Sequence, residues 1–547
     1  MITRAQGGVI ILTTSWGGRV VKMVEMGAGG VSGPKGLDLP GGFWYYLRYA
    51  GNRAPVAQRN RALASGARSR RFESCQAYHV AAGAAPAAKL STGGHSMAKL
   101  WDKGYAVDQE FEAFTTGDDY LLDRELVEAD CAASIAHARM LAKIGVLTAD
   151  EADKLAAELA AIAADRRSGK FTVEPADEDC HTAIENRLVA RLGDLGKKIH
   201  TCRSRNDQVI AATRVYARER LLGLADDTLA LCATLRAFAE KHEGVPMIGR
   251  THTQVAMPSS VGLWAGAWLE SLLDDLRLVQ GAYELNDQCP LGSAASYGVP
   301  MPIDRQLTSD LLGFAKVQNN VLYANNSRGK IESVILGACV QIAIDLSRVA
   351  QDLINFSLPE FGYFLIPKEL CTGSSIMPQK RNPCGLELVR AKTSTILACH
   401  SQILSILKGL PSGYNRDFQE TKRPFLQGLG LTTACVRVMD VTFQKLEVCE
   451  ERLVAAFKAA PEVFATDEAL RLVVEGVPFR DAYRQVAASL DKLGAADPRA
   501  SIAQRKHVGG PANLRLDIAD ADIQRVKEFV AERRDRLRRA LDALTGS

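Results

Sequence analysis

The sequence lacks an uncharged, mainly apolar run long enough to cross a membrane. The longest uncharged run after residue 96 covers 19 residues, 251–269, and contains His, Gln, Pro and four Ser or Thr residues. A membrane-spanning helix needs about 20 mainly apolar residues, so the sequence predicts no transmembrane segment and no membrane partner. The apolar run at residues 9–12 is also too short for the core of a signal peptide.

The sequence also lacks the cysteine and glycine patterns of disulfide, zinc and phosphate sites. Its 12 cysteines are scattered, with no CxxC pair. Such usage is typical of a reduced, cytoplasmic protein and argues against a disulfide framework or a structural zinc site. Neither G-x-G-x-x-G nor G-x-x-x-x-G-K-[ST] occurs, so no nucleotide-phosphate loop is indicated.

Charge divides the chain into two parts. Residues 1–96 carry a net charge of +9 and 16 of the 45 glycines, whereas residues 97–547 carry −5. A basic segment of this kind suits a nucleic-acid arm or a transit peptide. We favour a third interpretation, because RFES at residues 71–74 can be encoded by CGG TTC GAA TCC, which contains the T-arm consensus of a transfer-RNA gene. We therefore expect residues 1–96 to be an extension that is not native or is disordered, with the native start at Met97 and no nucleic-acid partner.

The rest of the chain is dominated by helical periodicity. Five long segments contain almost no proline: 207–242, 261–285, 327–357, 383–410 and 424–459. The mean globular helix has about 11–12 residues, and several of these segments are apolar around most of their circumference. Such helices must be buried in a bundle that subunits share. We predict an all-α protein with an N-terminal helical domain (97–204), a central long-helix bundle (205–459) and a small C-terminal helical domain (460–547).

One polar loop between the long helices stands out. Residues 373–383 read GSSIMPQKRNP. The simpler interpretation is a surface loop in which Asn382 and Pro383 begin the next helix. Together, however, two hydroxyls after a glycine, a lysine and an amide supply backbone N–H groups, a base and a positive charge. This combination can bind a carboxylate and stabilise negative charge as it develops.

This run resembles the GSSxMPxKxNP signature of the fumarase/aspartase superfamily. Two further segments, HTCRSRNDQV at 200–209 and GLPSGYNRDFQETK at 409–422, resemble the HTxRSRNDQV and GLPxxYNRDLQEDK motifs of the argininosuccinate lyase family. The resemblance covers about residues 97–547. It implies three mainly helical domains whose long helices assemble into the twenty-helix core of a homotetramer, with each active site built from three subunits.

The resemblance implies that argininosuccinate is cleaved to L-arginine and fumarate by β-elimination, the last step of arginine biosynthesis, without metal or organic cofactor. By correspondence Ser374 takes the proton, Lys380 stabilises the charge, and His252, paired with Glu387, protonates the leaving nitrogen. The roles of Ser374 and His252 can be exchanged. Outside the motifs, His252 would be read as a structural hydrogen-bonding residue and Glu387 as a solvated helix residue.

Substrate contacts also follow from the resemblance. They are Ser204, Arg205, Asn206, Thr251, Asn382, Tyr414, Gln419 and Lys422. Without the motifs, Tyr414 would be read as a packed aromatic and Lys422 as a solvated helix end, while Arg205 suits an anion ligand and a salt bridge equally. The family has a substrate-binding serine in an FxxS segment, but residues 114–117 read FTTG. Thr115 and Thr116 are the candidates to replace that serine.

Two other functions compete with this interpretation. One is another fumarate-releasing lyase of the superfamily, such as adenylosuccinate lyase, and residues 204–207 and 414–422 argue against it. The other is a non-catalytic, crystallin-like scaffold. The presence together of Ser374, His252, Lys380 and Glu387 argues against a scaffold.

Overall fold

The structure is a computed structural model that describes residues 2–5, 9–16, 19–26, 108–494 and 496–545. The chain divides into two compact units, Met1–Thr92 and Gly93–Ser547. In the first unit, β1 (Ile2–Ala5), β2 (Val9–Trp16) and β3 (Arg19–Met26) form an antiparallel sheet in that order. Residues 27–96, which carry most of the predicted extension, lie outside the described residues.

Short and medium helices form the start of the second unit. They are α1 (Gln109–Thr116), α2 (Asp119–Leu122), η1 (Asp123–Glu125), α3 (Val127–Lys143), α4 (Ala149–Arg167), η2 (Pro175–Asp177), α5 (Cys180–Leu192) and α6 (Asp194–Lys198). Thr148 Oγ1 accepts the Glu151 N–H at 3.2 Å, and the Glu151 carboxylate accepts the Thr148 N–H at 2.9 Å. This reciprocal capping box fixes the start of α4.

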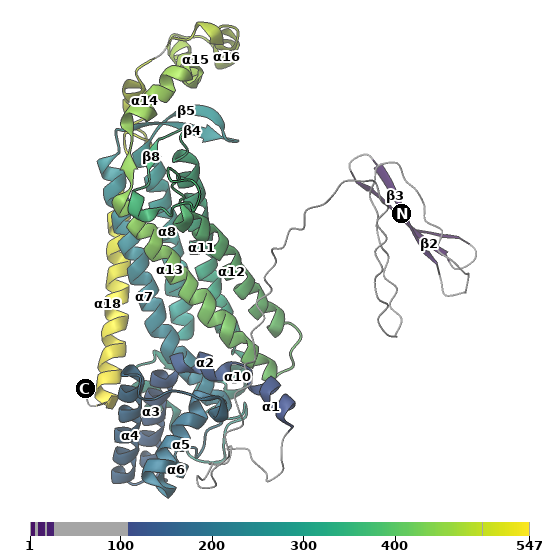
Figure 1. The fold of residues 1–547 in the computed structure, drawn as a ribbon, viewed down its shortest axis with the longest axis vertical. Coiled ribbons are helices and arrows are strands. Elements are labelled where there is room, and N and C mark those ends of the chain that lie inside the picture. Colours follow the sequence, from purple (N-terminus) through teal and green to yellow (C-terminus); the bar gives the residue numbers. More distant parts are fainter. Residues whose placement is uncertain (1, 6–8, 17–18, 27–107, 495, 546–547) are drawn as a thin grey trace. The chain divides into compact units, whose positions relative to one another are not determined.

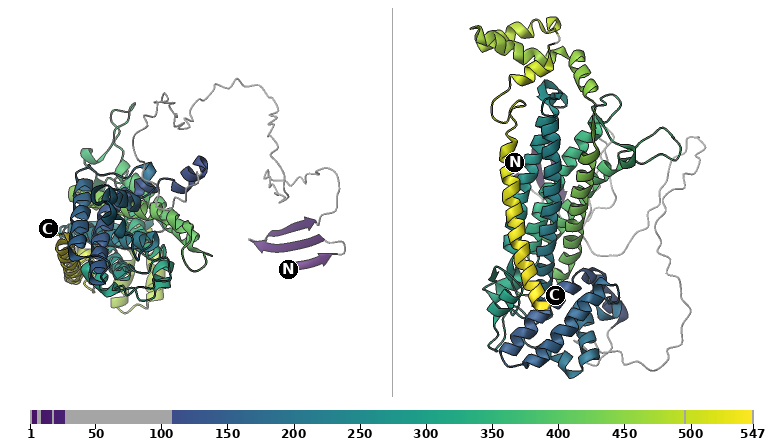
Figure 2. Two further views of the ribbon diagram at one scale, coloured as in Figure 1. Left: turned by 90° about the horizontal axis from the view of Figure 1, so that it is seen from below. Right: turned by 90° about the vertical axis from the view of Figure 1, so that its left-hand side faces the viewer.

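Long helices make up the centre of the second unit. They are α7 (Arg205–Lys241), α8 (Val261–Asn286), α11 (Lys330–Phe356), α12 (Cys384–Leu407) and α13 (Lys422–Lys445), and α18 (Leu516–Thr545) lies along α7 and α8 (Figures 1 and 2). Their apolar faces share one large core that contains Leu224, Leu276, Ile335, Ile396 and Met439. At about 1.5 Å per residue, the 37 residues of α7 span about 55 Å.

The central position of α11 explains its composition. This helix is long and apolar enough to cross a membrane, with a mean hydropathy of 1.6. However, 67% of its apolar stretch is buried inside the protein, as expected for the core helix of a bundle.

One expected helix is interrupted. We predicted a continuous helix over 424–459, but α13 ends at Lys445 and α14 (Glu450–Ala459) starts after a break. In the break, β9 (Glu447–Val448) pairs antiparallel with β8 (Phe364–Leu365), which follows α11 in the chain. The prediction was wrong because the backbone is extended to make this strand pair, and no proline or glycine marks the break in the sequence.

The expected polar loop at 249–258 is largely a β-hairpin. Its strands are β4 (Pro246–Thr251) and β5 (Gln254–Ser260). The remaining connections are β6 (Gln288–Cys289), α9 (Arg305–Leu311), β7 (Lys316–Val317), α10 (Val321–Asn326), η3 (Lys368–Leu370) and η4 (Arg416–Thr421). The C-terminal segment adds η5 (Pro461–Phe464), α15 (Ala465–Val474), α16 (Phe479–Ala487), η6 (Leu490–Lys492) and α17 (Pro498–Ala503). Helices α3 to α6 lie at one end of the bundle, and the β4–β5 hairpin with α15 and α16 lies at the other (Figure 1).

Candidate active site

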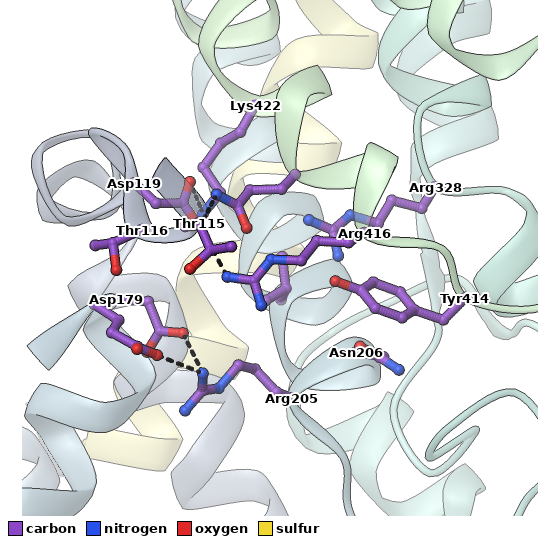
Figure 3. A pocket seen from close by; sticks show the side chains of 13 residues that line it. Thr115, Thr116, Asp119, Asp179, Arg205, Asn206, Arg328, Tyr414, Arg416 and Lys422 are labelled. Atoms are coloured by element: carbon purple, nitrogen blue, oxygen red, sulfur yellow. Dashed lines mark hydrogen bonds and ion pairs between the residues drawn. The ribbon is translucent and has the colours of Figure 1, made fainter. Parts of the chain in front are cut away.

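A charged pocket lies at the end of the bundle where α7 begins (Figure 3). Its empty space is about 470 Å³, including the open mouth. The lining residues are Thr115, Thr116, Asp119, Glu178, Asp179, Arg205, Asn206, Val209, Arg328, Tyr414, Arg416, Gln419 and Lys422. Five of the eight predicted substrate residues therefore line one pocket, although they come from segments about 200 residues apart.

Lys422 is the buried cation of this pocket. Only 6% of the residue is exposed, and its Nζ contacts the carboxylates of Asp123 and of Asp119, the latter at 2.9 Å. Burial disfavours the charged ammonium, but the two carboxylates outweigh burial and raise the pKa of Lys422 above its usual value. Lys422 is therefore a fixed positive charge at the start of α13. The alternative interpretation of Lys422 as a solvated residue at a helix end is wrong, because the side chain is buried.

Arg205 and Ser204 organise the start of α7. Arg205 Nη1 lies 3.1 Å from the Asp179 carboxylate, and its Nη2 donates to Thr182 Oγ1 at 2.8 Å. Ser204 is the N-cap, and its Oγ accepts the Asn206 N–H at 3.3 Å. Of the two roles open for Arg205, the structure shows the salt bridge. These contacts hold the Asn206 side chain at the pocket wall.

A second layer of buried charge supports the pocket from below. His181 Nδ1 lies 3.1 Å from the Asp130 carboxylate, and both residues are buried. Burial alone would lower the pKa of His181, but the Asp130 carboxylate outweighs it and the pKa is raised. For Asp123, burial alone would raise the pKa of the carboxyl group, but the positive charges of Lys422 and His181 outweigh burial and lower this pKa. The pocket therefore rests on a buried network of ionised side chains.

Asp123, Cys180 and His181 form one group in the described part of the chain whose donor atoms lie close enough to share a metal ion, within 4.8 Å of one another. Asp123 already contacts the Lys422 ammonium and accepts the Cys180 N–H at 3.1 Å. Burial raises the pKa of the Cys180 thiol far above its usual value, so the thiol stays protonated. These contacts commit the three side chains to protein partners rather than to a metal.

The signature loop is a closed, exposed turn before α12. Thr372 and Asn382 exchange backbone hydrogen bonds of 3.0 and 2.9 Å at its base. The Asn382 side chain donates to the Gly373 carbonyl at 3.1 Å instead of capping α12, which begins one residue after Pro383. The expected helix start at Asn382 and Pro383 is thus displaced, because this amide closes the loop.

Ser374 and Lys380 differ in their surroundings within this loop. The Ser374 hydroxyl oxygen accepts the Met377 N–H at 3.1 Å and the Ile376 N–H at 3.4 Å. Lys380 is exposed, and Glu387 is exposed in the first turn of α12. The loop therefore carries a hydroxyl that already accepts hydrogen bonds from backbone donors and, six residues later, an exposed lysine.

His252 lies at the tip of the β4–β5 hairpin. Thr251 pairs with Gln254, so His252 and Thr253 form a two-residue turn with φ values of 53° and 63°. Both residues are non-glycine in a left-handed conformation, which costs about 1–2 kcal/mol each. The turn exposes His252, and no hydrogen bond or ion pair joins it to Glu387 within the described residues.

The helices keep the predicted site residues apart. Asn206 lies in the first turn of α7, whereas His252 follows the far end of this helix, about 50 Å away. Ser374 precedes α12, and Tyr414 follows the opposite end of the 24 residues of α12, which span about 36 Å. Within one chain, the pocket residues therefore lie together, and the other predicted site residues lie away from the pocket. These are Thr251, His252, Ser374, Lys380, Asn382 and Glu387.

Comparison with known proteins identifies the family. A family described as lyase matches residues 103–398, just over half of the chain. The argininosuccinate lyase of Thermotoga neapolitana is 46% identical over 389 residues, which cover 71% of this chain and 97% of that protein. The chain belongs to the argininosuccinate lyase family. It is therefore a carbon–nitrogen lyase, and the resemblance carried by the three motifs is confirmed.

Two solved structures share the fold of this chain. EDDS lyase in complex with formate aligns with a TM-score of 0.69 at 23% identity, covering 81% of this chain and 95% of that chain. A class II fumarase from Schistosoma mansoni aligns with a TM-score of 0.60 at 16% identity, covering 73% and 94%. At these identities the likeness shows the fold alone, and it confirms the predicted all-α, fumarase/aspartase-like fold.

Family motifs did not reveal every residue of the pocket. The structure adds Asp119, Arg328 and Arg416 to the predicted set, and Asp123 as the buried partner of Lys422. Arg416 lies inside the 409–422 motif and could have been included. The other three lie in segments whose sequence resembles ordinary helix surface, so only the fold shows that they meet.

Proposed function

We propose that this chain cleaves argininosuccinate to L-arginine and fumarate, the last step of arginine biosynthesis, in the cytoplasm. Membership of the argininosuccinate lyase family supports the activity. The observation that carries the mechanism is the signature loop, in which the Ser374 hydroxyl accepts two backbone N–H groups. Such donors stabilise a negatively charged oxygen.

Ser374 is the proposed base. The Cβ–H of the succinyl group is weakly acidic, and removing its proton gives a carbanion whose charge spreads into the neighbouring carboxylate. Backbone donors to Ser374 Oγ favour its alkoxide form, and Lys380 and Asn382 would bind the carboxylate more tightly as its charge grows. Closure of the loop over substrate would exclude water and strengthen these interactions.

His252 is the proposed general acid. When the Cα–N bond breaks, the electron pair moves onto the guanidino nitrogen, which must receive a proton. An imidazole at the tip of a rigid hairpin can deliver this proton directly or through water. Glu387 would orient the ring by accepting its second N–H. Exchange of the two roles, with His252 as base and Ser374 as acid, remains the alternative.

A homotetramer would unite the separated groups. General acid–base catalysis requires groups within hydrogen-bond reach of one substrate, whereas His252 and Asn206 lie about 50 Å apart in one chain. Exposed apolar side chains on the long helices, such as Leu278, Leu388, Leu397 and Leu404, offer surface for association. Each site would then combine the pocket of one subunit with the hairpin and the signature loop of others.

Fumarate release tests the activity. The ultraviolet absorbance of fumarate should rise when the protein is mixed with argininosuccinate, and stay constant with adenylosuccinate, malate or aspartate. Turnover of adenylosuccinate alone would contradict the substrate assignment, and no turnover of any substrate would favour a scaffold.

Mixing inactive variants tests the shared site. Asn206→Leu and Ser374→Ala chains should each be inactive, and co-refolded mixtures should regain activity because some sites receive neither change. Mixtures that stay inactive while forming mixed assemblies would contradict the shared site.

A further inference from the structure

Two cysteines flank the signature loop. Cys371 directly precedes the loop, and Cys384 is the first residue of α12. Of the eleven described cysteines, seven are buried, and four, including these two, are partly exposed. Neither cysteine belongs to the three motifs or to the proposed acid and base, so the lyase function leaves both thiols unexplained.

The backbone brings the two stems of the loop together. Thr372 and Asn382 exchange two backbone hydrogen bonds, and the Cα atoms of such a pair lie about 5.5 Å apart. Cys371 is the residue before Thr372, and Cys384 lies two residues after Asn382. Both thiols are therefore attached to the paired base, with the whole loop between them.

Side chains also connect the two stems at this base. Cys384 Sγ lies 2.7 Å from the hydroxyl oxygen of Thr372, which is on the stem of Cys371. Burial raises the pKa of the Cys371 thiol, the Arg381 guanidinium on the opposite stem opposes this shift, and the Cys384 thiol adds to it. One thiol changes the pKa of another only when the two lie close together. The two cysteines are therefore neighbours across the base of the loop.

A disulfide between these cysteines would change the base of the loop. Disulfides join residues whose Cα atoms lie about 4.4–6.8 Å apart, a range that includes the spacing of a paired base. To form the bond, Cys384 Sγ has to leave the Thr372 hydroxyl and turn toward Cys371. Because Glu387 lies in the helical turn that Cys384 begins, this movement would shift the turn relative to the loop. The bond would also enclose Ser374 in a covalent ring.

We propose that Cys371 and Cys384 are a reversible modification site, at which a small-molecule disulfide oxidises the two thiols to one disulfide that locks the base of the signature loop and lowers lyase activity. The loss of activity rests on the proposed function, in which the loop closes over substrate, whereas the formation of the bond does not. In a reducing cytoplasm, a disulfide of this kind is typically transient and regulatory.

The oxidation consists of two thiol–disulfide exchanges. The thiolate of one cysteine attacks a sulfur of the small disulfide, which forms a mixed disulfide and releases the first small thiol. The thiolate of the other cysteine attacks the protein sulfur of this mixed disulfide and releases the second small thiol. The protein loses two electrons and two protons, and the small disulfide gains them. Because burial raises the pKa of the Cys371 thiol, the reaction should become faster as pH rises.

Peptide mapping after treatment with glutathione disulfide tests the bond. Trypsin cuts after Lys380 and Arg381, between the two cysteines, so the reduced protein yields the separate peptides 369–380 and 382–390. From the oxidised protein we expect these two peptides joined, with two hydrogens fewer than their sum and without bound glutathione. Dithiothreitol should separate them again.

Fumarate release from argininosuccinate measures the consequence. Oxidation should lower kcat/KM by about 10- to 100-fold, because small displacements of catalytic groups have effects of this size, and dithiothreitol should restore it. Cys371→Ser and Cys384→Ser should each give no joined peptides and resist inhibition by glutathione disulfide, and either variant suffices if the other does not fold. Cys449→Ser is the matched control, since Cys449 is also partly exposed but follows β9. This control should respond as the wild type does.

Three results would overturn the proposal. The first is the absence of joined peptides after treatment of the wild type, and the second is a fully joined protein with unchanged lyase activity. The third is inhibition that persists in both Cys371→Ser and Cys384→Ser, which would place the responsible thiol elsewhere. An inactive reduced wild type would instead contradict the proposed lyase function, and peptide mapping would still decide whether the disulfide forms.

Discussion

The pocket at the start of α7 and the signature loop before α12 differ in the surroundings of their lysines. The lysine of the pocket is buried and paired, and the lysine of the loop is exposed. In the pocket, Lys422 is buried and contacts two carboxylates, and a second layer of buried ion pairs lies beneath. In the loop, Lys380 is exposed and has no ion-pair partner in the described part of the chain. The pocket pairs these charges within a single chain, whereas the loop presents the Lys380 side chain to solvent.

This difference suggests a division of labour. A buried, fully paired network has a fixed geometry, which suits recognition of the part of the substrate that does not change charge during the reaction. An exposed loop has no fixed surroundings, so it can close on substrate and surround the developing charge only then. Substitutions should therefore affect folding in the first region and catalysis in the second.

The largest expected effect is on catalysis in the loop. Ser374→Ala should lower kcat for argininosuccinate by about 1,000-fold, because a positioned base typically contributes 10²- to 10⁴-fold. The unfolding free energy should change by less than about 0.5 kcal/mol, since the loop is exposed. Fumarate release and denaturant unfolding measure the two effects. Ser375→Ala is the neighbouring control, and full turnover by Ser374→Ala would end the assignment of Ser374 as base or acid.

The second largest effect is expected on stability, and it should differ between variants of Lys422 and Lys380. Lys422→Met leaves the buried carboxylates of Asp119 and Asp123 without their cation and should destabilise the protein by about 3–5 kcal/mol. Lys380→Met should change stability by less than about 0.5 kcal/mol but strongly reduce kcat. Unfolding in denaturant, at one fixed protein concentration, distinguishes the variants. Equal stabilities would show that the pocket is not preorganised by its ion pairs.

Sequence reasoning succeeded where one segment carries the information. The periodicity that predicts the long helices α8 and α11 is local, and the structure confirms both helices. It failed where the local structure or the partner of a residue depends on a segment far away in the sequence. The break at 446–449 depends on a strand more than 80 residues earlier, and Asp123 becomes a partner of Lys422 only through a contact across 299 residues. Motif matching found Lys422 but could not show what surrounds it.

A smaller effect concerns pH. Because the Asp130 carboxylate raises the pKa of His181 in the folded state, the folded protein keeps this proton at pH values where the unfolded chain has released it. The resulting stabilisation is complete below about pH 6.5, the ordinary value, and is lost as pH rises through the folded-state pKa. Stability should fall with pH there by at most about 1.4 kcal/mol per unit.

Variants locate this pH dependence in the pocket. His181→Gln and Asp130→Asn should each flatten the decline in unfolding free energy above about pH 6.5. An unchanged slope in both variants would place the responsible group elsewhere. The comparison between the regions predicts that Ser374→Ala retains the wild-type slope, because the loop does not contact the buried pair in the described structure.

The smallest effect comes from two serines that make the same kind of bond. Ser204 Oγ accepts the Asn206 N–H at 3.3 Å, and Ser374 Oγ accepts the Met377 N–H at 3.1 Å. Ser204 begins a buried 37-residue helix, so Ser204→Ala should cost about 1 kcal/mol of unfolding free energy. Its kcat should fall far less than that of Ser374→Ala. A large loss of kcat in Ser204→Ala with unchanged stability would mean that the pocket, too, takes part in the chemical step. The division between a recognising region and a reacting region would then be wrong.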